Sequence, residues 1–273
     1  MQNMWNYAAG IANPNPDFEG HGLSLIPCRS ALWVDHKGKR IGPDPLVTGF
    51  DTVHMCRQIN QLQIPHSWQI LNYRIAMKEL AISGCEHNQS IRDRKFLTMM
   101  KDLLLGNKKL INQMLSESEQ FIAADTLPEL IEKMNQLTPD VPVSSKQLTT
   151  TVNQFDNMVK RGEKFWSDEQ IRRILSVRTW SSDRLRTCYP KPLLEHGPLI
   201  AIKLNLITRK CLGGIKTDLQ GRVLDQSDTP IDGLYSIGEA SGFGGGGSNG
   251  RRSLEGTFLP GCILTARQTA RYL

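Results

Sequence analysis

The sequence predicts a mixed α+β fold in which a mostly helical middle part stands between two parts that contain strands. Residues 1–50 hold a hairpin pattern, residues 51–195 carry helix caps and helical periodicity, and residues 196–273 alternate short strands with turns before a final helix. We expect the first segment to lead into a helical capping or substrate domain, and the last to be the C-terminal portion of a second domain. With 273 residues, the chain is long enough for one large core or two smaller ones.

The N-terminal segment contains one strong hairpin signal. Residues 30–35 alternate apolar and polar side chains like a strand, and His36-Lys37-Gly38-Lys39 turns the chain back into Arg40-Ile41. Gly42-Pro43-Asp44-Pro45 then interrupts regular structure.

Three helix starts are recognisable in the middle segment. Thr126 and Glu129 form a capping box, with Pro128 in the first turn. Ser144 can cap a second helix, and residues 167–169 open a third. The apolar stripes expected to pack in the core are Leu130, Ile131 and Met134, then Leu148, Val152, Phe155 and Val159, then Ile171, Ile174 and Leu175.

The C-terminal segment changes to short strands. Residues 200–206 form an apolar run, and residues 215–218 and 222–225 flank a turn. Residues 233–239 predict a buried strand that ends in an acid. The closing helix has Thr257 as its expected N-cap. It carries an apolar stripe of Leu259, Cys262, Ile263, Ala266 and Ala270.

The composition excludes several classes of protein. A hydrophobic content of 39% and a charged content of 22% are typical of a globular protein. No apolar stretch is long enough for a membrane span, and the N-terminus lacks a signal-peptide pattern, so we expect a cytoplasmic protein. The six cysteines show no Cys-x-x-Cys spacing, so we expect free thiols, most of them buried. The scattered histidines predict no metal site.

The net charge of +6 raises the question of nucleic-acid binding. Its positive charges stand in short mixed groups such as Arg92-Asp93-Arg94-Lys95 and Asp183-Arg184-Leu185-Arg186, without interleaved aromatic residues. We interpret them as a solvated surface and expect no nucleic-acid partner. An anionic cofactor or substrate would use the same excess charge.

A glycine-dense loop at residues 242–250 stands between the expected strand and the closing helix, where three chemistries compete. Gly242, Gly244 and Gly247 satisfy the dinucleotide pattern Gly-x-Gly-x-x-Gly, but no second strand follows the helix. Ser248 fits a hydrolase nucleophile elbow, but no histidine follows it to act as base. The third chemistry, flavin binding, also uses the acid and the helix. Glu239 can bind ribityl hydroxyls, and the helix N-terminus can stabilise a reduced flavin by roughly 1 kcal/mol.

A family resemblance rests on the closing segment. The residues that carry it are Thr217-Asp218, Val223-Leu224-Asp225, Pro230-Ile231, Gly233-Leu234-Tyr235 and Gly238-Glu239, with Leu212-Gly213-Gly214 upstream. This segment resembles the end of the FAD-dependent dehydrogenases that include fumarate reductase, succinate dehydrogenase flavoprotein and 3-ketosteroid dehydrogenases. Leu32-Trp33-Val34-Asp35 and Gly38-Lys39-Arg40 resemble a hairpin of the same family. The resemblance implies an incomplete FAD-binding domain of strands plus the C-terminal helix, with a mostly helical capping domain.

The resemblance also implies a cofactor, FAD, and roles for individual residues. Gly238 and Glu239 would hold the ribityl chain, and Thr257 and Phe258 would contact the flavin ring through their backbone. Arg252 would be the catalytic arginine that binds a carboxylate or carbonyl of a small-molecule substrate. For the proton step, Arg29, Tyr73 and Arg172 are candidates in the cap.

Two departures from the family limit this interpretation. Thr208-Arg209-Lys210-Cys211 lacks the histidine of fumarate reductase-like members, which argues against a small dicarboxylate substrate. Residues 1–50 lack the fingerprint that binds the ADP half of FAD. We therefore expect the C-terminal part of a flavin-dependent oxidoreductase that transfers hydride between FAD and a carbon next to a carbonyl, completed by an N-terminal half or partner chain. The alternative is an inactive remnant that acts as a binding or assembly module. In either case the lone chain is expected to be poorly soluble or to self-associate.

Overall fold

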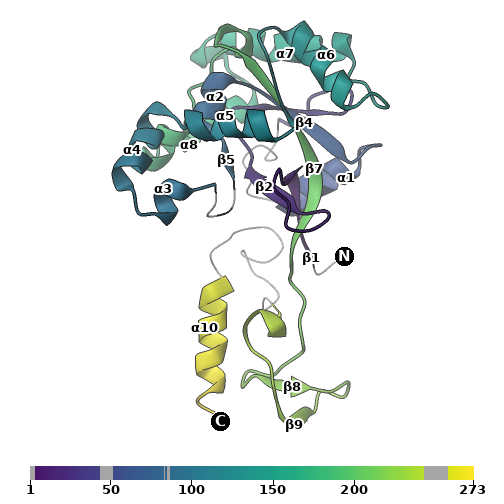
Figure 1. Cartoon of the computed structure of the whole chain (residues 1–273), viewed down its shortest axis with the longest axis vertical. Helices are drawn as coiled ribbons and strands as arrows, with labels where there is room; N and C mark the ends of the chain where they lie inside the picture. The colour runs from purple at the N-terminus through teal and green to yellow at the C-terminus, as the bar shows by residue number, and fades with distance from the viewer. Residues whose placement is uncertain (1–3, 44–51, 83, 85–86, 243–257) are drawn as a thin grey trace. The chain divides into compact units, whose positions relative to one another are not determined.

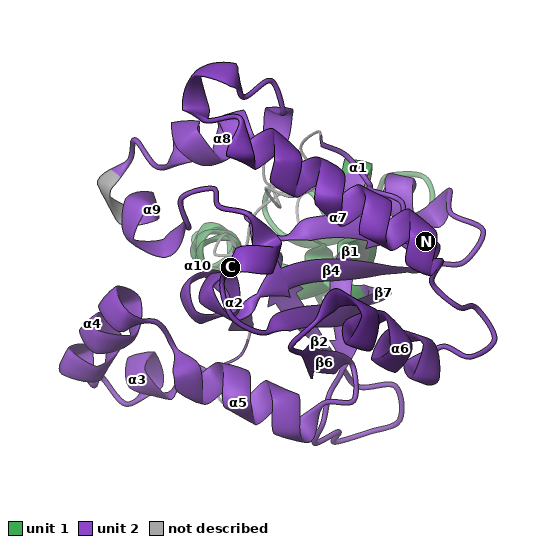
Figure 2. Ribbon diagram, turned by 90° about the horizontal axis from the view of Figure 1, so that it is seen from above, with its two compact units in different colours: residues 1–7, 50–54, 208–273 green, residues 8–49, 55–207 purple. Residues whose placement is uncertain are grey.

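The structure is a computed structural model that describes residues 4–43, 52–82, 84, 87–242 and 258–273 (Figure 1). The chain divides into two compact units (Figure 2). Unit 1 comprises Met1–Tyr7, Phe50–His54 and Thr208–Leu273, and unit 2 comprises Ala8–Gly49 and Met55–Ile207. The mixed α+β class predicted from the sequence is confirmed, since helices and antiparallel strands both occur.

Unit 2 is built on a sheet whose strands run in the order β3-β4-β7-β1-β2-β5, with β6 also pairing with β7. The pairings of β1 with β2, β2 with β5, β3 with β4, and β7 with both β4 and β6 are antiparallel. The strands are β1 (Met4–Ala12), β2 (Gly22–Ile26), β3 (Leu32–Asp35), β4 (His66–Asn72), β5 (Ala81–Ile82), β6 (Phe121–Ala124) and β7 (Leu199–Cys211).

The helices of unit 2 surround strands β1, β4 and β7 in Figure 2. They are α1 (Thr52–Asn60), whose first three residues belong to unit 1, α2 (Tyr73–Glu79), α3 (Gln89–Arg92), α4 (Phe96–Leu105), α5 (Lys108–Glu117), α6 (Leu127–Leu137), α7 (Ser145–Lys160), α8 (Glu169–Val177) and α9 (Ser181–Arg186). Two short 3₁₀ turns, η2 (Glu163–Phe165) and η3 (Leu193–Glu195), complete the unit. All seven residues of β4 are buried, which makes this strand the centre of the core.

Unit 1 contains a small hairpin, a turn and the last helix. β8 (Arg222–Leu224) pairs antiparallel with β9 (Pro230–Tyr235), and the 3₁₀ turn η4 (Gly238–Ser241) and helix α10 (Phe258–Thr269) follow. The expected turn at residues 218–222 is confirmed by a hydrogen bond from the Asp218 amide to the Arg222 carbonyl oxygen, at 3.0 Å.

The three predicted helix caps are confirmed. Thr126 Oγ1 accepts the Glu129 amide at 3.4 Å, and Ser144 Oγ accepts the Gln147 amide at 3.2 Å. Asp168 Oδ1 accepts the Ile171 amide at 3.1 Å. The stripes behind these caps are buried as predicted, apart from Leu175, which is half-buried. Short side chains placed one turn before an apolar stripe therefore determine where these helices begin.

The predicted hairpin is also confirmed. Val34 forms a β-bridge with Arg40, and the Asp35 amide donates to the Lys39 carbonyl oxygen at 2.8 Å. Gly38 has a φ of +86°, and a Cβ there would lie 2.8 Å from Leu148 Cβ. Glycine is needed at Gly38 both for this turn and for its close approach to α7.

Two expectations need correction. Strand β4 was not predicted within the mostly helical middle segment, because its buried Ser67, Gln69 and Asn72 interrupt the apolar pattern. The predicted buried strand at residues 233–239 is wrong. β9 ends at Tyr235, and five of its six residues are exposed.

Candidate functional site

The part of unit 1 that resembles a flavin-contacting segment is held together by backbone contact. The Ile215 amide donates to the Ala240 carbonyl oxygen at 2.9 Å. A Cβ built on Gly214 would lie only 2.0 Å from the Gly242 amide nitrogen. Since no side chain fits there, glycine at Gly214 lets the Leu212-Gly213-Gly214 segment lie directly against the end of η4.

The same turn is fixed to the last helix. The Gly238 amide donates to Thr265 Oγ1 of α10 at 3.0 Å. Gly238 has a φ of +61°, and a Cβ there would lie 3.0 Å from Cys262 Sγ. Gly238 therefore combines a positive φ with close approach to α10, and the turn that carries Glu239 is positioned by these contacts.

The predicted cofactor residues are only partly described. Glu239 lies in η4 and is exposed. Phe258 is the first residue of α10, as a backbone contact at a helix N-terminus requires. Thr257, Arg252 and the loop glycines from Gly244 onward lie outside the described residues. Their roles stay predictions.

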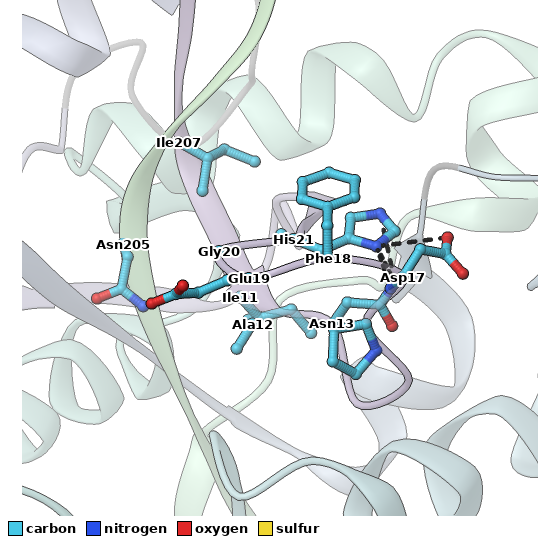
Figure 3. A pocket seen from close by; sticks show the side chains of 12 residues that line it. Ile11, Ala12, Asn13, Asp17, Phe18, Glu19, Gly20, His21, Asn205 and Ile207 are labelled. Carbon is cyan, nitrogen blue, oxygen red and sulfur yellow. Dashed lines mark hydrogen bonds and ion pairs between the residues drawn. The ribbon is translucent and has the colours of Figure 1, made fainter.

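Unit 2 contains a pocket of about 590 Å³ that the sequence did not reveal (Figure 3). The loop between β1 and β2 forms one side, and Asn205 and Ile207 of β7 form another. The His21 ring stacks on Phe18, with ring centroids 4.6 Å apart and an interplanar angle of 11°. The lining thus combines apolar walls with a few polar groups, as ligand pockets do.

His21 lines this pocket together with Asp17 and Glu19. Its Nδ1 accepts the Asp17 amide at 3.2 Å and lies 3.6 Å from Asp17 Oδ2. The Asn13 side-chain amide nitrogen lies 3.3 Å from the same ring nitrogen. The sequence signal for this site was a nine-residue polar loop between two strands, residues 13–21, which carries no recognisable motif.

The hairpin arginine of the family resemblance has a structural role here. Arg40 donates to both carboxylate oxygens of Asp168, at 2.5 and 3.1 Å, and to Gln170 Oε1 at 2.7 Å. Its guanidinium also lies over the Phe155 ring, 5.4 Å from the centroid. These contacts fasten the hairpin to α7 and α8.

The three candidates for proton transfer are not brought together. Arg29 donates to Asp183 Oδ1 at 2.7 Å and to Thr187 Oγ1 at 3.0 Å. The Tyr73 hydroxyl donates to Asn112 Oδ1 at 3.1 Å, and Arg172 is exposed on α8. The side chains of Arg29 and Tyr73 therefore form hydrogen bonds that link parts of unit 2. None of the three candidates lines the pocket of His21.

An enclosed carboxylate lies elsewhere in unit 2. Glu79 accepts the amide and hydroxyl of Ser30, at 2.9 and 2.6 Å, and the Cys188 amide at 2.6 Å. Burial raises the pKa of Glu79 above its usual range, although these hydrogen bonds oppose the shift. The acid ties the segment after β2 to the segment after α9, which is a structural role.

The described cysteines correct one expectation. All five are free thiols, but only Cys28 and Cys188 are buried. Burial raises the pKa of Cys56 to about 11 and that of Cys188 to about 12, so both are thiols at neutral pH.

The described residues contain no cluster of three or more metal-ligating side chains. In the same part of the chain, no helix is long and apolar enough to cross a membrane.

Comparison with known proteins identifies the family. The FAD binding domain family matches residues 1–259. The chain belongs to this family. Its cofactor is therefore FAD, and the exposed Glu239 beside α10 fits a ligand that offers hydroxyl groups.

The relatives of this FAD-binding chain are dehydrogenases. It is 40% identical over 272 residues to a KsdD-like steroid dehydrogenase of Mycobacterium tuberculosis, covering 98% of this chain and 48% of that protein. A KsdD-like steroid dehydrogenase of Mycolicibacterium smegmatis is also 40% identical, over 94% of this chain and 47% of that protein. The chain thus spans about half the length of the curated relatives it matches.

Solved structures agree on the fold. The 3-ketosteroid Δ1-dehydrogenase from Sterolibacterium denitrificans matches with a TM-score of 0.58 and 18% identity, over 98% of this chain and 42% of that one. A flavocytochrome c3 fumarate reductase matches with a TM-score of 0.53 and 17% identity, over 98% of this chain and 36% of that one. At this identity the likeness establishes the fold alone.

Proposed function

We propose that this chain is the substrate-capping and flavin-closing part of an FAD-dependent dehydrogenase that acts on a ketosteroid or a similar apolar ketone. The observation that carries the proposal is the 40% identity to a KsdD-like steroid dehydrogenase across 98% of the chain. The closing segment supports it, since Gly214, Gly238 and Gly242 hold the exposed Glu239 beside α10. The absence of a histidine in residues 208–211 also disfavours a fumarate-like substrate.

When bound, FAD supplies the acceptor for a hydride from a carbon near the substrate carbonyl. A proton leaves the adjacent carbon, and a carbon–carbon double bond forms between the two. In this chain Arg252 would hold the substrate carbonyl, and Glu239 would hold the cofactor. Activity further requires a nucleotide-binding half, on the same polypeptide or on a partner.

His21 is our candidate for the group that accepts the proton. It lies in the pocket of unit 2, and the Asp17 carboxylate is nearby. Histidine is also the side chain that most often transfers protons in enzymes. The replacement His21→Gln should lower kcat at least about 100-fold and leave FAD retention unchanged. The control His196→Gln should leave both kcat and FAD retention unchanged. A flavin-loaded His21→Gln variant with the kcat of the original chain would exclude His21 as the proton acceptor.

The decisive experiment supplies the chain with the N-terminal half of a KsdD-like steroid dehydrogenase by co-expression. Oxidation of a 3-ketosteroid is then followed with an artificial electron acceptor, with fumarate as the comparison substrate. Turnover of the steroid supports the proposal. A stable, flavin-loaded complex that turns over neither compound would favour the alternative, a non-enzymatic binding or assembly module.

A further inference from the structure

The segment containing α3 and α4 carries an exposed apolar face. In α4, Leu97 is 88% exposed and Phe96 is 66% exposed. The other large apolar side chains exposed on this segment are Ile91, Met100, Leu104 and Leu105. Isolated exposed apolar residues are common, but six within fifteen consecutive residues, 91–105, form a patch that needs an explanation.

This face is fixed rather than frayed. Lys78 Nζ donates to the Leu104 carbonyl oxygen at 2.6 Å and so caps the C-terminus of α4. The Asn107 amide donates to the Met77 carbonyl oxygen at 2.8 Å, directly after the helix. Met99 and Leu103 are half-buried, whereas Phe96, Leu97, Met100 and Leu104 are exposed.

Positive charge surrounds the patch. Residues 88–109 contain six basic and two acidic side chains, a net charge of +4 out of the +6 of the whole chain. The basic residues flank α4 on both sides or lie within it: Arg92, Arg94, Lys95, Lys101, Lys108 and Lys109. The mixed charge group at residues 92–95 is exposed, as the sequence predicted, and it directly precedes the exposed apolar side chains of α4.

We infer that the outer face of α3 and α4 binds an anionic membrane surface. Apolar side chains that project between lysines and arginines suit a helix lying in the headgroup layer, where the charges contact lipid phosphates. At ten residues, α4 is too short to span a bilayer, so the contact is peripheral. This inference does not rest on the proposed dehydrogenase activity.

Flotation of the full chain with vesicles tests it, because aggregated protein sediments whereas membrane-bound protein rises. We expect about tenfold more floated protein with vesicles that contain phosphatidylglycerol than with phosphatidylcholine alone, and less at high salt. The double replacement Phe96→Ser/Leu97→Ser should reduce flotation about tenfold. The charge reversal Lys101→Glu/Lys108→Glu should do the same.

Matched variants of unit 1 and of other surfaces provide the controls. Leu219→Ser/Leu264→Ser removes two side chains that are 86% and 68% exposed, and Lys146→Glu/Lys191→Glu reverses two other exposed lysines. Both should float like the original chain. The inference is overturned if nothing floats or if the controls lose as much binding. It is also overturned if Phe96→Ser/Leu97→Ser changes only the oligomeric state, which would identify the face as a protein interface.

Discussion

Gly214 lies so close to Gly242 that a Cβ on Gly214 would be 2.0 Å from the Gly242 amide nitrogen. Contact between backbone atoms cannot be relieved by rotating a side chain, so the replacement Gly214→Ala must displace one of the two segments. Displacement of η4 would move Glu239, which this turn carries.

The replacement Gly214→Ala should therefore destabilise unit 1 by about 1–3 kcal/mol, as overpacking does in well-packed regions. It should also weaken FAD retention by the completed protein. The control is Gly261→Ala in α10, where a Cβ meets nothing within 4 Å. This control should be neutral or stabilising by up to about 1 kcal/mol, and urea unfolding measures both. Equal stability of the two variants would show that the close contact has no energetic role.

Gly10 in β1 provides a second steric test. A Cβ there would lie 2.3 Å from Ile207 Cγ2, which is a side-chain atom. The replacement Gly10→Ala should lower stability by about 1–3 kcal/mol, and the second replacement Ile207→Ala should recover part of that loss. Thermal melts of the two single variants and the double variant measure the coupling. Additive losses in the double variant would contradict the contact.

Asp168 has two structural roles, as partner of Arg40 and as N-cap of α8. The Asp168 side chain is 8% exposed and that of Arg40 is 20% exposed. The replacement Asp168→Ala would therefore leave the guanidinium of Arg40 largely buried and without its carboxylate partner. We expect a loss of about 3–5 kcal/mol. The control is Glu169→Ala, because the neighbouring Glu169 pairs with Arg173 at the surface. This control should lower the free energy of unfolding by less than about 1 kcal/mol. Denaturant unfolding should separate the two variants clearly, and similar losses would refute the account.

His66 predicts a pH dependence. Burial lowers its pKa to about 4, with the nearby Lys203 and His36 contributing in the same direction. Because its ordinary pKa is 6.5, the unfolded chain binds a proton between these values while the folded chain does not. Stability should therefore fall as the pH drops from about 6.5 towards 4, by up to about 2–3 kcal/mol.

The replacement His66→Gln isolates this contribution. The raised pKa of Glu79 acts in the opposite direction, since its stabilisation is lost as the pH rises through its folded value. The difference between the original chain and His66→Gln cancels that effect, because both retain Glu79. A variant with an unchanged slope between pH 6.5 and 4 would rule out His66 as the cause.

The sequence predicted what local physics determines. Thr126, Ser144 and Asp168 cap their helices through side chains three residues from their partners, and Gly38 turns its hairpin within a few residues. Such contacts need no knowledge of the rest of the fold. The α+β class was predicted for a similar reason, because helix caps and short strands with turns are local signals. The closing segment was identified by its resemblance to a known family.

The remainder depends on distant partners. Strand β4 contains Ser67, which accepts the Trp33 indole N–H at 2.7 Å, and only the folded sheet shows that this polar residue belongs in the core. The pocket of His21 needs β7 beside the β1–β2 loop, nearly 200 residues away in the chain. The exposed apolar face of α4 could not be predicted either, because a sequence does not show which apolar side chains the fold leaves uncovered.

The visible absorption spectrum of the chain tests the central claim most directly. It is recorded with an N-terminal half supplied, after incubation with FAD and desalting, for the original chain, Glu239→Ala and the control Glu132→Ala. The account predicts retained flavin in the original chain and the control, and a loss of affinity of about tenfold or more in Glu239→Ala. Equal flavin retention in all three would contradict the role of Glu239, and none in any would contradict the assignment of this chain to a working flavin site.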